Sequence, residues 1–307
     1  MVSYMKKSLE SIIGHDNFGL LPPAEYLAEL PRHEDTEVDD CTGCLDPCTE
    51  HKEYPPYFNI ETDFPILGSV KPYGRHIIIA TGCSDWVKKI EEEQGTFAYS
   101  LSKAESDSTQ SKPWKNMVTN SSLVSVHSTL TDGCDVLVLP DNILVANVTV
   151  DKANEFYQLF VQTDLPTQPM DIDLISNDSR LGQMKIFKNP YKKLILLCSH
   201  KKRDKKCGIT APILAQEFDH VLREKDISDH DAAVVMVSHV GGHKFAGNVI
   251  CYINDGTRGI WYGRVKSCHV HIIVEETIIN GKIVKDIYRG AMDNSFEKQV
   301  KKSFLKW

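Results

Sequence analysis

The chain has 307 residues, of which 41% are hydrophobic and 25% are charged, and its formal net charge is −7 at pH 7. This composition is typical of a folded globular protein that is long enough for two modest domains. The negative charge disfavours general binding to nucleic acid. No run approaches the ~20 apolar residues of a membrane span, and the first residues lack the apolar core of a secretion signal. We therefore expect a cytoplasmic protein that binds neither nucleic acid nor a membrane.

The first 56 residues form a polar leader that is acidic and interrupted by prolines. Within it, Cys41, Cys44, Cys48 and His51 have the spacing of a small zinc site. An ordered loop that contains cysteines without a metal is the alternative. No strand is expected before Cys41, which disfavours a thioredoxin-type redox pair. The pattern leaves both interpretations open.

Beyond the leader, short apolar runs typical of buried strands alternate with amphipathic stretches typical of helices. In the first half we expect strands at 76–80, 122–128, 134–140 and 142–150, helices at 84–95 and 151–163, and a surface loop at 101–114. In the second half we expect strands at 192–200, 232–239, 248–253 and 259–265, and helices at 210–225 and 268–278. The expected helix caps are Ser84 or Asp85, Asp151 and Thr210.

The order of elements is nearly the same in the two halves. Each half has strand, helix and strand followed by a hairpin and a helix, which is the order of a thioredoxin-like domain. We therefore predict an α/β fold of two thioredoxin-like domains in tandem, each a mixed sheet flanked by helices. The domains are expected at 57–165 and 185–307, the latter including a C-terminal tail, with a linker at 166–184.

Two cysteines and two histidines of the second half stand at the ends of predicted elements. Cys198 ends a strand, Cys207 precedes a helix, and His239 and His243 flank a glycine pair after another strand. Because the ends of neighbouring parallel strands meet at one edge of a sheet, we expect these four side chains to converge there.

The first half carries only part of this pattern. Cys83 corresponds to Cys198, and His127 corresponds to His239, but the other two residues have no counterpart. We therefore expect the first domain to be a degenerate copy that lacks the site.

Two sulfur and two nitrogen donors indicate a metal centre, and the spacing narrows its type. A zinc finger has two to four residues between its cysteines, whereas eight separate Cys198 from Cys207. A 2Fe–2S cluster also takes four protein ligands, two for each iron. The Rieske type is disfavoured because its Cys-x-His motif occurs at 198–200 but not at 207–209.

The segments CSHKKRDKKCG, HVGGHKFAGN, GIWYGRV and GKIVKDIYRG resemble the sucrase/ferredoxin-like family of fungal and plant proteins. The resemblance covers most of the chain. It implies a C-terminal thioredoxin-like ferredoxin domain with a 2Fe–2S cluster held by two cysteines and two histidines in a non-Rieske arrangement. Carried onto this chain, the ligands are Cys198, Cys207, His239 and His243. We find no spaced pair of carboxylates in a recognisable glycosidase setting.

From these observations we predict a cytosolic iron–sulfur protein that transfers single electrons, coupled to protons, through this cluster. An electron carrier is favoured over an enzyme with its own substrate. The alternatives are a zinc-stabilised interaction protein without redox activity and a thiol oxidoreductase that uses Cys198 and Cys207.

Two further features suggest partners. The basic segment 201–206 is expected either to be solvated or to dock an acidic redox partner, and His200 beside it is expected to be solvated. The chain ends on Trp307, which resembles a tail recognised by the cytosolic iron–sulfur assembly machinery, although Lys306 departs from that pattern.

Overall fold

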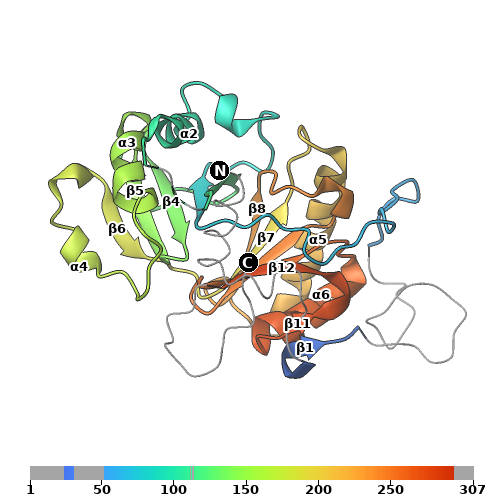
Figure 1. Cartoon of the computed structure of the whole chain (residues 1–307). Helices are drawn as coiled ribbons and strands as arrows, with labels where there is room; N and C mark the ends of the chain where they lie inside the picture. Colours follow the sequence, from blue (N-terminus) through green and yellow to red (C-terminus); the bar gives the residue numbers. More distant parts are fainter. Residues whose placement is uncertain (1–23, 31–51, 111, 113, 294–307) are drawn as a thin grey trace, which may run out of the picture.

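The computed structural model describes residues 24–30, 52–110, 112 and 114–293. The cysteine-rich loop with Cys41 and the tail with Trp307 lie outside the described residues, so their predicted roles stay predictions. Strands from both halves form one mixed sheet, in the order β12-β10-β9-β7-β8-β3-β2-β4-β5-β6. Helices of the two halves flank it at opposite ends (Figure 1). In the described ranges, no helix has the length and apolarity that crossing a membrane requires.

Each half contributes five strands to the sheet. Those of the first half are β2 (His76–Ala80), β3 (Met117–Ser121), β4 (Cys134–Leu139), β5 (Ile143–Val148) and β6 (Lys185–Lys188). Those of the second half are β7 (Leu194–Cys198), β8 (Ala233–Val237), β9 (Val249–Ile253), β10 (Arg258–Tyr262) and β12 (Tyr288–Asp293). A separate small sheet pairs β1 (Leu27–Ala28) in parallel with β11 (Ile283–Val284).

The two halves repeat one order of strand pairing. In the first half, β2 is parallel to β3 and antiparallel to β4, and β5 and β6 follow as antiparallel strands. In the second half, β7 is parallel to β8 and antiparallel to β9, and β10 and β12 follow. The halves join where Ser121 of β3 pairs antiparallel with Val237 of β8. One sheet therefore runs through both halves.

The helices are of uneven length and regularity. The longer ones are α2 (Phe97–Asp107) and α5 (Lys205–Glu224); the short ones are α3 (Ala153–Phe156), α4 (Ile172–Ile175) and α6 (Val270–Ile272). Two of the short helices continue as π-helix, α3 into Tyr157–Val161 and α6 into Ile273–Ile279. Single 3₁₀ turns lie at Ala24–Tyr26, Ile90–Glu92, Val150–Lys152, Ser179–Leu181, His243–Phe245, Ser267–His269 and Lys285–Ile287.

Three apolar cores explain why the strands are continuous apolar runs. Successive side chains of a strand point to opposite faces of the sheet. Ile77 of β2 therefore packs under α2 and α3, and Ile195 of β7 packs under α5 and α6. Their neighbours Ile78 and Leu196 point the other way, into a third core that both halves share. Both faces are buried, so an alternating polar pattern is absent from these strands.

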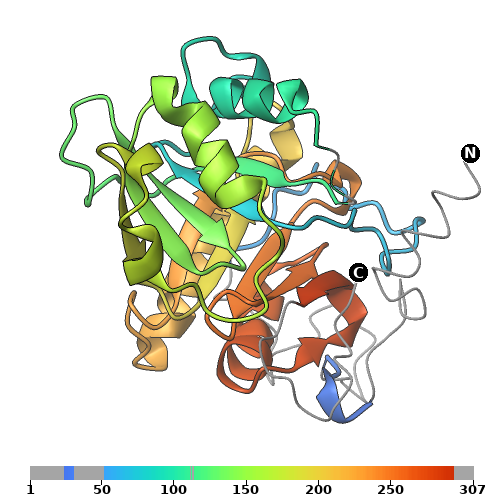
Figure 2. The ribbon, with the colours of Figure 1, turned by 60° about the vertical axis from the view of Figure 1, so that its left-hand side comes forward.

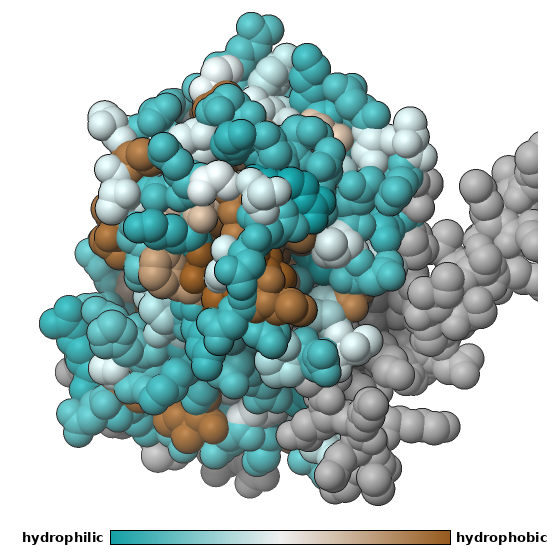
Figure 3. Space-filling model, turned by 90° about the vertical axis from the view of Figure 1, so that its left-hand side faces the viewer, coloured by the Kyte–Doolittle hydropathy of each residue, from teal (hydrophilic) through white to brown (hydrophobic). Residues whose placement is uncertain are grey.

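The strand at one end of the sheet is protected by charge. β6 pairs only with β5, and its lysines Lys185 and Lys188 are exposed. Charged edge strands discourage pairing with other chains. Figure 3 views the molecule from this side and shows a largely hydrophilic face with apolar residues gathered near its centre.

The prediction of a helix at 84–95 is wrong. Only Ile90–Glu92 makes a 3₁₀ turn there, and the helix of this region is α2, which begins after the predicted helix and extends into the predicted loop at 101–114. The cause is the cap: the hydroxyl of Thr96 accepts a hydrogen bond from the amide of Tyr99, which starts the helix at Phe97. The charged run before this cap has a helix-like apolar spacing without forming a helix.

Two other boundaries differ from expectation. No strand forms at the expected 122–128; β3 lies just before it, at Met117–Ser121, and Val124 and Val126 are 67% and 73% exposed. Helix α5 begins after Asp204 rather than at the expected cap Thr210, because the Asp204 side chain caps the amide of Lys206. The other expected strands are present with ends shifted by a few residues.

The predicted fold class is confirmed in its coarse form, an α/β protein with a large mixed sheet flanked by helices. Figure 2 shows the helices of the first half gathered on one side of the strands. The segment Lys185–Lys188, which we expected to open the second domain, is the outer strand beside β5. The exact domain bounds stay a prediction.

Candidate metal centre

The candidate site lies where two parallel strands of the second half end. Cys198 is the last residue of β7, and it is level with Val237, the last residue of β8. His239 follows two residues later, so the strand direction brings its imidazole to the sheet edge where Cys198 lies. Every residue of β7 is buried, and burial on both faces fixes the register that places these side chains.

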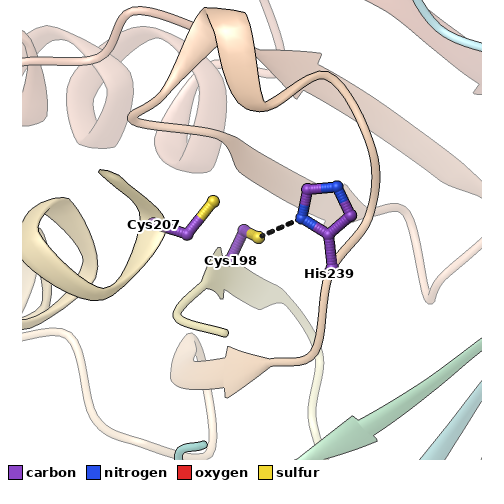
Figure 4. A group of neighbouring side chains, drawn as sticks. All are labelled: Cys198, Cys207 and His239. Atoms are coloured by element: carbon purple, nitrogen blue, oxygen red, sulfur yellow. Dashed lines mark hydrogen bonds between the residues drawn. The ribbon is translucent and has the colours of Figure 1, made fainter. Parts of the chain in front are cut away.

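Cys207 reaches the same edge from the first turn of α5. The helix begins after Asp204, and this turn points the Cys207 sulfur toward that of Cys198 (Figure 4). The His239 ring lies beside them, and the three ligand atoms are all within 4.8 Å of one another. The cysteines are 2% and 1% exposed. Three of the four predicted ligands are thus brought together.

The two sulfurs hold their protons unequally. A hydrogen bond from Cys207 is the main reason that the pKa of Cys198 lies well below its usual range. His239, whose Nδ1 is 3.7 Å from the Cys198 sulfur, lowers it further. The same hydrogen bond between the two cysteine side chains, together with burial, raises the pKa of Cys207. Of the two sulfurs, Cys198 is therefore the one that loses its proton more readily, and binding of a metal by both cysteines releases their protons.

A buried arginine holds the histidine loop in place. Arg289 is 2% exposed, and its Nη1 donates to Oδ1 of Asn248 at 2.6 Å. The Asn248 amide in turn donates to the carbonyl of Gly242 at 3.1 Å. Gly242 has a φ of 69°, and a Cβ there would lie 2.3 Å from the Arg289 guanidinium. Burial lowers the pKa of Arg289 to about 10, so its guanidinium stays cationic at neutral pH and favours the charged form of the nearby Cys198 sulfur.

His243 is the one predicted ligand outside this group. It begins the turn His243–Phe245 and is exposed, and its ring centre is 6.1 Å from that of His239. The planes of the two rings differ by 32°. One short loop therefore carries both histidines, and the role of His243 as a fourth ligand stays a prediction.

Some side chains of the basic segment 201–206 bond to other parts of the chain. Lys206 forms an ion pair with Glu61 at 2.9 Å, and Arg203 donates to the carbonyl of Lys88 at 3.0 Å. Lys201 and Lys202 have exposed side chains. His200, which we expected to be solvated, is 2% exposed, so that expectation is wrong.

A pocket between the halves borders the site at His239. It has a volume of about 110 Å³, and both His200 and His239 line it. The other lining residues come from both halves: Lys88, Ile90, Glu91, Val118, Arg203 and Ser238. Among the three grouped ligands, His239 is therefore the one that borders the pocket, whereas the two cysteines are buried.

The corresponding strand ends of the first half lack such a group. Cys83 is exposed. The Nδ1 of His127 lies 3.2 Å from Asp135, a carboxylate that also accepts from Ser128 at 2.6 Å. Within the described residues, Cys198, Cys207 and His239 form the group of donors close enough to hold a metal ion.

The donor set fits a metal. Thiolate and imidazole are the preferred ligands of zinc and of iron–sulfur centres. With zinc–sulfur bonds of about 2.3 Å and zinc–nitrogen bonds of about 2.0–2.1 Å, neighbouring ligand atoms of a tetrahedral site lie roughly 3.5–3.8 Å apart. The Cys198 sulfur and His239 Nδ1 are already 3.7 Å apart. This group could therefore bind a metal with small side-chain adjustments.

Comparisons with known proteins agree with the resemblance inferred from the motifs. The sequence profile of the sucrase/ferredoxin-like family matches residues 66–290. Actin patches distal protein 1 of Saccharomyces cerevisiae is 32% identical over 256 residues, which cover 78% of this chain and 80% of that protein. Proteins named Altered inheritance of mitochondria protein 32 from Debaryomyces hansenii and Clavispora lusitaniae are 34% and 48% identical over 181 and 100 residues. Those two matches cover 50% and 33% of this chain, and 65% and 35% of the relatives, which is less than two thirds of either relative.

These comparisons overturn the predicted function. The relatives are named for mitochondrial inheritance and actin patches, and the family description goes no further than a likeness to ferredoxin. None of them supports an iron–sulfur protein that transfers electrons, so that prediction is wrong. The physical reason is that two cysteines and two histidines serve single ions and clusters alike. A ligand motif therefore indicates metal binding without fixing what the metal does.

Proposed function

This chain belongs to the sucrase/ferredoxin-like family, and we propose that its second half binds a metal centre through Cys198, Cys207, His239 and His243. The observation that supports the proposal best is the burial of two sulfurs side by side with an imidazole nitrogen, all within 4.8 Å. Burying a thiolate away from water is costly unless a positive partner offsets the cost. A bound cation is such a partner for both sulfurs.

Two occupants suit this donor set. A single tetrahedral ion is supported by the 3.7 Å spacing of the Cys198 sulfur and His239 Nδ1. The 2Fe–2S cluster that the resemblance implies also takes two cysteine and two histidine ligands, and it stays a prediction. The proposal itself is the ligand set, and it assigns no electron-transfer role to the protein.

The test is the metal content of the full chain purified without added metal. Total metal is measured by mass spectrometry and the absorption spectrum is recorded. The metal-free protein is then titrated with Co²⁺, which gives thiolate charge-transfer and tetrahedral ligand-field bands. Cys198→Ser removes one sulfur of the proposed centre, and Cys83→Ser is the matched control at the corresponding strand end of the first half.

The proposal requires that Cys198→Ser hold one metal centre fewer per chain than the wild type, and that Cys83→Ser hold as many as the wild type. One zinc with no visible absorption identifies a single ion, and two irons with visible absorption identify the cluster. A wild-type chain that holds no metal and gives no thiolate band with Co²⁺ would falsify the proposal. Such a result would instead favour thiol chemistry at Cys198 and Cys207.

We also propose that the two halves are tandem thioredoxin-like units and that the first is a degenerate copy. The repeated order of strand pairing supports this, and so does the finding that, among the described residues, neither Cys83 nor His127 belongs to a group of donors close enough to hold a metal ion. An experimental structure tests it by superposition of β2–β5 on β7–β10. Halves that fail to superpose over these strands and the helix after each hairpin would reject it.

The remaining predictions concern the surroundings of the protein. We retain the proposal that an acidic partner docks at residues 201–206, where Lys201 and Lys202 are exposed. Contact of Trp307 with an assembly machinery and a cytoplasmic location also stay predictions. Tagged wild-type chain and a Lys201→Glu, Lys202→Glu variant, compared for bound proteins at two salt concentrations, test the partner.

A further inference from the structure

His200 lies between the metal-ligand strand ends and the first half of the chain. Its Nδ1 is 3.1 Å from the amide nitrogen of His239. Its Nε2 is 2.8 Å from the carbonyl of Val87 and 3.1 Å from that of Trp86. An amide can only donate and a carbonyl can only accept, so Nδ1 is the acceptor and Nε2 carries the hydrogen. One neutral tautomer therefore satisfies every contact.

The amide of His239 needs the contact with His200 because the backbone hydrogen bonds of strand β8 do not extend to this residue. β8 ends at Val237, and the amide of Ser238 is bonded to the carbonyl of Asn120. The amide of His239 comes next and uses the His200 ring in place of a strand partner. His200 thus fixes the main chain of the residue whose Nδ1 faces the Cys198 sulfur.

The neighbours of His200 tie the same segment to the first half. Ser199 donates to the carbonyl of Ser84 at 2.6 Å, and the amide of Lys202 donates to the Asp85 carboxylate at 3.0 Å. The indole of Trp86 meets the His200 ring edge-on, with ring centres 5.7 Å apart. Residues 84–88 of the first half therefore support residues 199–203 through hydrogen bonds and ring packing.

We propose that His200 is a positioning residue of the metal centre, which holds the His239 main chain and anchors it to the first half through Val87. The inference rests on the proposed metal function. It gives the first half a role, because its strand-end segment shapes a centre whose ligands all come from the second half. Partners of this kind, which hold a ligand without touching the metal, change metal affinity by about 10–100-fold when removed.

Two substitutions separate the two bonds of the His200 ring. In His200→Asn, the side-chain oxygen takes the place of Nδ1 and can accept from the His239 amide, but nothing reaches Val87. In His200→Gln, the terminal amide takes the place of Nε2 and can donate to Val87, but the acceptor for His239 is lost. His76→Gln is the control, because His76 is a buried histidine in the shared interior that bonds Tyr252 and Thr119 instead.

The readouts are Co²⁺ affinity by competition, the energies of the Co²⁺ ligand-field bands, and hydrogen exchange of the His239 amide in the metal-free chain. We expect His200→Gln to weaken Co²⁺ binding by about 10–100-fold, shift the bands and expose the His239 amide to exchange. His200→Asn should keep the amide protected and lose less affinity. His76→Gln should lower thermal stability but leave the bands in place.

The outcomes distinguish this inference from the proposal on which it rests. If the wild-type chain binds Co²⁺ with thiolate bands and His200→Gln has the same affinity, bands and His239 exchange, His200 has no positioning role. If the wild-type chain binds no metal, the metal function fails and with it the role of His200 in a metal centre. The exchange of the His239 amide then still decides whether His200 holds that main chain.

Discussion

The strand ends of the two halves have the same layout and different contents. In the first half, Cys83 is exposed and His127 is hydrogen-bonded to the carboxylate of Asp135. In the second half, Cys198 is buried, and its sulfur lies beside Cys207 and His239. Each pair stands at or beyond the ends of two parallel strands, β2 and β3 in the first half and β7 and β8 in the second. A repeated sheet therefore supplies the position of a site, whereas its chemistry depends on the side chains that follow the strands.

The difference also shows how the two halves depend on each other. In the first half, the imidazole of His127 is hydrogen-bonded to the carboxylate of Asp135. Residues 84–88, which follow strand β2, make hydrogen bonds to the second half. In the second half a helix N-terminus brings in another sulfur. The first half therefore acts as a structural scaffold that supports the site, and the second half carries the ligands. Variants in each half should therefore differ in what they impair: stability for the first half, and metal binding for the second.

The largest expected effect is on stability and comes from the first half. Arg75 and Asp141 form a bidentate ion pair at 2.8 and 3.0 Å, and each side chain is 1% exposed. Asp141→Ala leaves the guanidinium buried without its carboxylate, which costs about 3–5 kcal/mol. Urea unfolding should report this loss, while the fraction that stays folded binds one metal as before. A loss below about 1 kcal/mol would mean that the pair is well solvated.

The next effect is on metal affinity and is confined to the second half. A structural zinc site of four ligands contributes about 10–16 kcal/mol, so one sulfur accounts for roughly 3 kcal/mol or 100-fold in affinity. Cys207→Ser should lose this affinity, and Cys83→Ser should keep the wild-type value. Competition with a chelator of known affinity measures both. Equal affinities for the two variants would erase the distinction between the halves.

The third effect is a loss of stability in mild acid. Burial lowers the pKa of His76 to about 3 and that of His269 to about 4, both below the ordinary value. Between these values and pH 6.5 the unfolded chain binds more protons, so the free energy of unfolding falls as the pH falls. Each histidine adds a slope of up to about 1.4 kcal/mol per pH unit.

The pH effect is measured on the metal-free chain by denaturant unfolding between about pH 6.5 and 5, a window chosen from these pKa directions and the ordinary histidine value. His76→Gln should remove about half of the slope that the two histidines contribute. Its network with Tyr252 and Thr119 links the two halves, so a lower starting stability is also expected. An unchanged slope in this variant would show that His76 is not the buried neutral group described.

The smallest effect concerns the histidine of the first half. His127 has a side chain that is 31% exposed, and its partner Asp135 also accepts bonds from Ser128 and the His127 amide. His127→Ala should therefore cost no more than about 1 kcal/mol and leave Co²⁺ affinity and bands unchanged. A change in the bands would give the first half a direct part in the centre and contradict its role as scaffold.

The sequence predicts the strands and the ligand edge well, for a physical reason. Strands such as Leu194–Cys198 are buried on both faces and appear as unbroken apolar runs. The chain order of the elements then places Cys198 and His239 at one sheet edge. The helix at Phe97–Asp107 is missed because a single cap at Thr96 outweighs the charged, helix-like spacing before it.

The supporting residues of the site are not visible in the sequence. His200 stands beside Lys201 and Lys202 and so resembles a solvated residue, yet its partners are carbonyls of Trp86 and Val87, far away in the chain. Arg289 likewise acts through Asn248 on the loop of Gly242. Bonds to the main chain of distant segments leave no periodic pattern, so only the folded structure reveals them.

X-ray absorption at the edge of the metal that the chain retains identifies the atoms that bind this metal. We expect a shell of sulfur and nitrogen scatterers, two of each, and the loss of one sulfur in Cys198→Ser. For zinc the distances should be about 2.3 Å to sulfur and 2.0–2.1 Å to nitrogen. A shell made only of oxygen and nitrogen, with both cysteines still free to react with thiol reagents, would contradict this expectation.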